Sequence, residues 1–62
     1  MTESAFAVYQ DGQRVARVDG PREQAESEIM HYAAMYAREG LPIMVKELRG
    51  KRWVEIAGWV GR

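Results

Sequence analysis

A helical segment with turn residues at both ends constrains the fold of this chain more than any other feature. Pro21 follows Gly20, and proline is favoured at the first helical position because its missing N–H has no helical partner there. Gly40 can end a helix, and Pro42 prevents the helix from continuing. We therefore predict a helix from residue 21 to residue 38 or 39, with Gly20 as its N-cap.

Apolar residues within this segment recur with helical spacing and form one stripe. The intervals of 4, 3, 1 and 3 residues place them on a single face, which we expect to cover the core and to bury both tyrosine rings. The residues of this stripe are Ala25, Ile29, Tyr32, Ala33 and Tyr36.

Segments of strand character lie on both sides of the helix. Residues 5–10 and 14–18 flank Asp11-Gly12, a pair typical of tight hairpin turns. Residues 43–48 and 52–60 form a second pair around the connection at 49–51. Val15 and Val18 have opposite parity, which indicates a bulge or an edge position in the second strand.

The order of these segments predicts an α+β fold of the ββαββ type. We expect one domain over residues 1–62, with an antiparallel four-stranded sheet, one helix across one face, and a disordered segment at residues 1–4. The order of the strands within the sheet is left open.

The closing strand alternates in a way that predicts an uncovered surface. By strict alternation its tryptophans, Trp53 and Trp59, lie on one face together with Glu55, while Val54 and Ile56 lie on the other. One layer of helix covers only one face of a sheet. The tryptophans therefore either face outward as a contact surface or fold over the sheet edge and complete the core.

Composition excludes several classes of protein. The chain has 62 residues and no cysteine, so disulfides and cysteine-type zinc sites are excluded, and a core this small could gain stability from self-association. No apolar run approaches the roughly 20 residues that span a bilayer. We expect a cytoplasmic protein without a metal or another cofactor.

Charge is balanced overall and divided along the chain. Residues 1–39 carry four basic and seven acidic side chains, a net −3, and residues 40–62 carry five basic and two acidic, a net +3. The two halves could attract each other within the fold, or the basic half could meet an anionic partner.

Residues suited to catalysis are scarce. His31 is the single histidine, on the expected outer face of the helix, and Glu23 and Glu26 suit the electrostatics of a helix start. We expect no enzymatic activity.

The face around the tryptophans predicts a partner-binding site. Trp, Met and Arg are enriched in protein interfaces, and a homodimer would be the simplest use of such a face. On that hypothesis, Trp53→Ala should weaken association more than stability. The expected contact residues are Tyr9, Met44, Lys46, Arg52, Trp53 and Trp59.

A nucleic-acid site is the alternative. It would use the basic side chains of the second hairpin: Lys46, Arg49, Lys51 and Arg52. Aromatic rings beside basic residues on a sheet can stack single-stranded bases. The neutral net charge and the absence of a glycine-aromatic signature argue against this use.

Three segments give the chain a resemblance to a known class. They are the helix at 21–38, the exit Gly-Leu-Pro-Ile at 40–43 and the closing Gly-Lys-Arg-Trp-Val-Glu at 50–55. The layout resembles short ββαββ proteins encoded by phages and prophages, and it is similar to some single-domain anti-CRISPR proteins. The resemblance implies a non-enzymatic protein that acts by occupying a surface, with Lys51, Arg52 and Trp53 as partner contacts.

Overall fold

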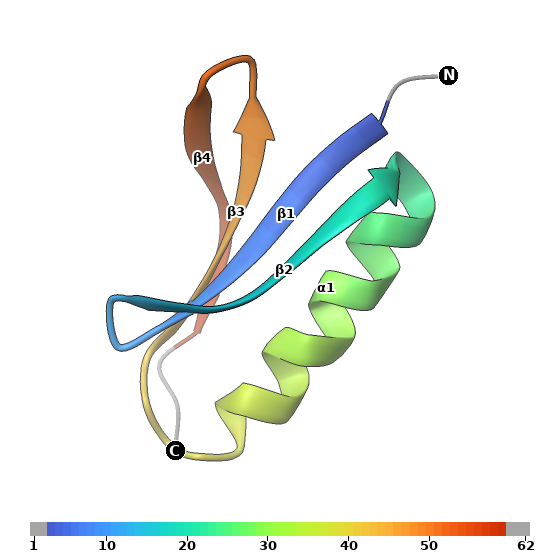
Figure 1. Ribbon diagram of the computed structural model, residues 1–62. Coiled ribbons are helices and arrows are strands. Elements are labelled where there is room, and N and C mark those ends of the chain that lie inside the picture. Colours follow the sequence, from blue (N-terminus) through green and yellow to red (C-terminus); the bar gives the residue numbers. More distant parts are fainter. Residues whose placement is uncertain (1–2, 60–62) are drawn as a thin grey trace.

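Two hairpins and a connecting helix make up the protein (Figure 1). The computed structural model describes residues 3–59. Its elements are β1 (Glu3–Gln10), β2 (Gln13–Pro21), α1 (Arg22–Ala37), β3 (Ile43–Arg49) and β4 (Arg52–Trp59). The predicted ββαββ order and α+β class are confirmed.

The sheet is antiparallel throughout, in the order β2-β1-β3-β4. The first strand of each hairpin is therefore central, and β2 and β4 form the two edges. Helix α1 crosses one face and packs against β1, β2 and β3 (Figure 1). We call the opposite side of the sheet the open face.

The turn between β1 and β2 has the backbone that its sequence predicts. Asp11 and Gly12 both have positive φ, 51° and 85°, between the paired residues Gln10 and Gln13. Positive φ at both central positions matches the twist of a two-residue hairpin, and Asp-Gly tolerates it.

The core lies between α1 and the two central strands. β1 contributes Phe6 and Val8, and the helix contributes Ile29 between two alanines. The helical stripe is confirmed at its centre and wrong at one margin, because Tyr32 is 39% exposed. Within residues 3–59, the buried residues of this cluster are Phe6, Val8, Ala25, Ile29, Ala33, Ile43 and Val45.

The helix begins one residue later than predicted. Pro21 has ψ 138°, an extended value, and it still pairs with Glu3 in the sheet, so Pro21 rather than Gly20 is the N-cap. The pairing also corrects the expectation of a disordered start, because Glu3 and Ser4 belong to β1. Residues 1–2 and the predicted end of the last strand at residue 60 lie outside the described residues.

Strand β2 contains the predicted irregularity and also occupies an edge. Val8 pairs with Ala16 and Tyr9 pairs with Arg14, which leaves Val15 as the extra residue of a bulge. Val15 and Val18 can therefore both pack against the core in spite of their opposite parity.

Candidate functional site

A bulge in β4 changes the faces of its side chains. Lys46 pairs with Glu55 and Val45 pairs with Ala57, so Ile56 has no partner on β3. Ile56 and Ala57 consequently both pack against the core cluster. Strict alternation would have sent these neighbours to opposite faces, and it fails beyond the bulge.

The two tryptophans are separated by this bulge. Trp53 pairs with Leu48 on the open face, whereas Trp59 pairs with Ile43, a core residue on the helix side. The prediction that Trp53 and Trp59 share one face is wrong. They occupy different surroundings and are expected to have different roles.

Trp53 lies beneath two cations from the far edge of the sheet. The guanidinium carbons of Arg14 and Arg17, on β2, lie 5.8 and 5.4 Å from the centre of its ring. Ala5 and Ala7 lie on the open face of β1, between these edge strands, and are only 6% and 0% exposed. Because α1 covers the other face, we infer that these three long side chains cover the alanines. We call Arg14, Arg17 and Trp53 the Trp53 cluster.

Asp19 holds one of these cations in place. Arg17 donates from Nε and Nη2 to the two carboxylate oxygens of Asp19, at 2.8 and 3.0 Å. The hydrogen bond raises the pKa of the Arg17 guanidinium and lowers the pKa of the Asp19 carboxyl. This pairing fixes the planar group beside the indole.

Asp19→Asn should therefore reduce stability at neutral pH and leave it unchanged in acid. Because the folded-state pKa of Asp19 lies below its unfolded value, the ion pair contributes above the unfolded value of about 4, and its contribution disappears as the pH falls through the lowered folded value. Urea unfolding of both proteins between pH 2 and pH 7 measures the difference. A difference that stays constant over this range would contradict the prediction.

A groove lies at the other end of the open face, where β4 ends. Its volume is about 450 Å³, and its lining combines open-face residues with Ile43 and Trp59, which pair with each other on the helix side. Gly58 leaves space in it, because this residue pairs with Met44 and has no side chain. The lining residues are Tyr9, Gly12, Pro42, Ile43, Met44, Lys46, Gly58 and Trp59. We call this site the Trp59 groove.

Among the described residues of the groove lining, Lys46 is the charged one. Its Nζ lies 4.8 Å from the centre of the Tyr9 ring, a cation–π contact. Glu55 is its cross-strand neighbour, yet among residues 3–59 Lys46 forms no ion pair with a carboxylate. Glu55 is directed toward Gly58 instead, with Oε2 3.5 Å from the position that a Cβ would occupy there.

The predicted contact residues therefore fall in three places. The Trp59 groove collects Tyr9, Met44, Lys46 and Trp59 from three strands. Trp53 belongs to the Trp53 cluster. Arg52 is exposed at the start of β4 and does not line the groove. Four described groove residues were not among the predicted contacts: Gly12, Pro42, Ile43 and Gly58.

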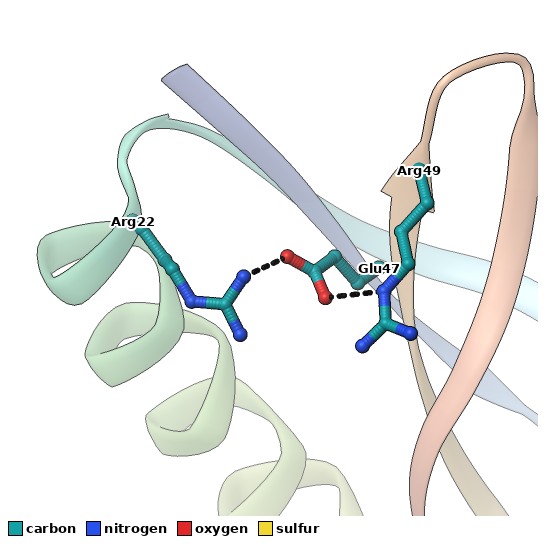
Figure 2. A network of polar contacts seen from close by, with 3 residues as sticks. All are labelled: Arg22, Glu47 and Arg49. Atoms are coloured by element: carbon teal, nitrogen blue, oxygen red, sulfur yellow. Dashed lines mark hydrogen bonds and ion pairs between the residues drawn. The ribbon is translucent and has the colours of Figure 1, made fainter. Parts of the chain in front are cut away.

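A buried carboxylate connects the helix to the sheet (Figure 2). Glu47 is only 3% exposed, and it accepts hydrogen bonds from Arg22 Nη1 at 2.6 Å and from Arg49 Nε at 3.0 Å. Arg22 is the first residue of α1. In this contact the helix supplies the cation and the second hairpin supplies the anion, opposite to the net charges of the two halves of the chain.

The residues of the alternative nucleic-acid site do not form one patch. Lys46 lies on the open face beside Tyr9, whereas Arg49 is bound to Glu47 next to the helix. Lys51 and Arg52 are exposed around the hairpin tip. A continuous basic track for a phosphate backbone would need these side chains on one side of the sheet.

His31 is exposed on the outer side of α1, as predicted. It lines a second hollow with Ser27, Glu28 and Tyr32, and its ring meets that of Tyr32 edge-on. No side-chain hydrogen bond links His31 to Ser27 or Glu28 within the described chain. The described residues also contain no group of three potential metal ligands.

The sequence matches no protein-family model, no curated protein and no solved structure. The resemblance to phage-encoded proteins stays a prediction. In the described part of the chain, no helix has the length and apolar character needed to cross a membrane.

Proposed function

We propose that this chain is a small binding module, without catalysis, that captures a protein partner in the Trp59 groove. The observation that carries the proposal is the convergence of Tyr9, Met44 and Trp59 on one hollow of about 450 Å³. This volume falls within the range of about 300–1,000 Å³ typical of ligand sites. Concave apolar sites with few polar groups are the usual places where a partner's side chain binds.

The exposure of the groove residues supports an unfilled contact surface. Trp59 is 44% exposed, and Met44 and Tyr9 are half-buried. Aromatic and methionine side chains are enriched in protein interfaces, and tryptophan and tyrosine are enriched among the residues that contribute most to binding. A second copy of the chain is the simplest partner, and the absence of cysteine fits a cytoplasmic setting.

Gly58→Val should abolish partner binding without lowering stability. A Cβ at position 58 meets only Glu55 Oε2 and Ile43 O, both at 3.5 Å, so it fits the strand while the rest of the side chain fills the groove. Valine also favours extended backbone over glycine. Peptides selected from a random display library on the wild-type protein should lose at least tenfold in affinity for the variant.

Met35→Ala is the matched control for this experiment. Met35 is 50% exposed on α1 and does not line the groove, so the variant should keep full affinity. Light scattering shows separately whether the wild type is a dimer that Gly58→Val converts to a monomer. Unchanged peptide affinity and unchanged molar mass in Gly58→Val would together refute the proposed site.

A further inference from the structure

We infer that the Trp59 groove selects an acidic segment in extended conformation, with one large apolar side chain next to a carboxylate. This inference rests on the proposed function and adds the chemistry of the partner. The apolar side chain fills the space over Gly58 beside Trp59, and the carboxylate binds the Lys46 ammonium.

The charge of the groove favours a carboxylate in the partner. Among the described residues that line the groove, Lys46 is the cation and none is an aspartate or a glutamate. Among residues 3–59 its ammonium has an aromatic face beside it and no carboxylate paired with it. A partner carboxylate would supply the missing counter-ion in a half-buried place, where such a pair is less screened than on an open surface.

The position of Glu55 sets the direction of the bound segment. The Glu55 carboxylate lies close to Gly58, on the β4 side. A partner carboxylate is repelled there and attracted to the Lys46 ammonium, which lies on β3 beside the Tyr9 ring of β1. The partner's apolar side chain therefore points toward Trp59 and its acidic group toward β1.

The edge position of β4 favours an extended peptide as the partner. Gly58 and Trp59 belong to an edge strand, which pairs with β3 on one side and with no other strand in residues 3–59. An extended segment can add main-chain hydrogen bonds along such an edge while one side chain fills the neighbouring pocket. A small free acid would lack these bonds, so we assign the site to a peptide.

Capped dipeptides test this assignment directly. The probes are Ac-Asp-Phe-NH₂, its neutral match Ac-Asn-Phe-NH₂, and Ac-Asp-Ala-NH₂, titrated against amide and indole NMR signals of Tyr9, Gly58 and Trp59. We expect Ac-Asp-Phe-NH₂ to bind about three- to fivefold more tightly than the asparagine probe, the range of a partly exposed ion pair. Of the two acidic probes, Ac-Asp-Ala-NH₂ should bind more weakly, because its methyl group does not fill the groove.

Lys46→Gln is the decisive variant, with Lys51→Gln as its control at the exposed hairpin turn. The aspartate preference should vanish in Lys46→Gln, persist in Lys51→Gln, and decline with added salt. Equal binding of the two phenylalanine probes, or a preference that survives in Lys46→Gln, overturns the acidic assignment and leaves the groove itself standing. Groove signals that no probe shifts refute the acidic segment, and a Gly58→Val variant with unchanged affinity and molar mass refutes the proposed function.

Discussion

The double variant Arg22→Met/Arg49→Met should lower the free energy of unfolding by about 3 kcal/mol. Both replacements leave the Glu47 carboxylate in place, 3% exposed and without the two guanidinium groups that bind it (Figure 2). A buried charge without a partner bears its desolvation cost in full. Urea unfolding at neutral pH, followed by circular dichroism, measures the loss.

Glu47→Met should cost much less, about 1 kcal/mol or below, although it removes the centre of the same network. The guanidinium side chains left behind, Arg22 and Arg49, are 56% and 57% exposed, so water solvates them. The new apolar side chain faces Phe6, its partner on β1. Equal losses in the two variants would show that the attraction outweighs the desolvation cost and would contradict this account.

Local sequence signals predicted the elements of this fold well. The helical stripe around Ile29, the Asp-Gly turn and the glycine at position 40 depend only on neighbours within the chain. A period of 3.6 or 2 residues is imposed by backbone geometry, whatever the tertiary context. The ββαββ layout follows from these signals alone.

Strand order and register could not be predicted in the same way. The bulge at Ile56 depends on how β4 meets β3, and this single extra residue moves Trp59 to another face. The contact between Arg17 and Trp53 requires the order β2-β1-β3-β4, because it spans the whole sheet. Interactions between strands set these features, and one sequence records them only weakly.

Glu47 and Gly58 were not predicted, yet each left a signal within its own strand. Glu47 has the same parity as Ile43 and Val45, so alternation alone would have placed this carboxylate on the helix side, where it needs a cationic partner. Gly58, within a strand, marks a place without side-chain volume. Each signal concerns one strand, which is why it survives without knowledge of the register.

Trp53→Ala should lower the free energy of unfolding by about 2 to 3 kcal/mol. A loss of this size would show that Trp53 stabilises the fold. Full truncation of a buried tryptophan costs about 3–5 kcal/mol, and Trp53 is half-buried. The variant also removes the ring shared by Arg14 and Arg17, and it uncovers Ala7. Thermal and urea unfolding measure this loss of stability, which should be present even when the protein is monomeric.

Trp59→Ala should have the opposite effects to Trp53→Ala: a small loss of stability and a complete loss of binding. Trp59 is 44% exposed at the end of β4, so its removal should cost less than about 1 kcal/mol of stability while it abolishes peptide binding in the groove. Trp53→Ala, assayed below its unfolding transition, should keep that binding, because Trp53 does not line the groove. If Trp53→Ala instead remained fully stable and lost the partner, the open face above Ala5 and Ala7 would be the binding surface. The two tryptophans on either side of the bulge at Ile56 would then not have the separate structural and binding roles proposed for them.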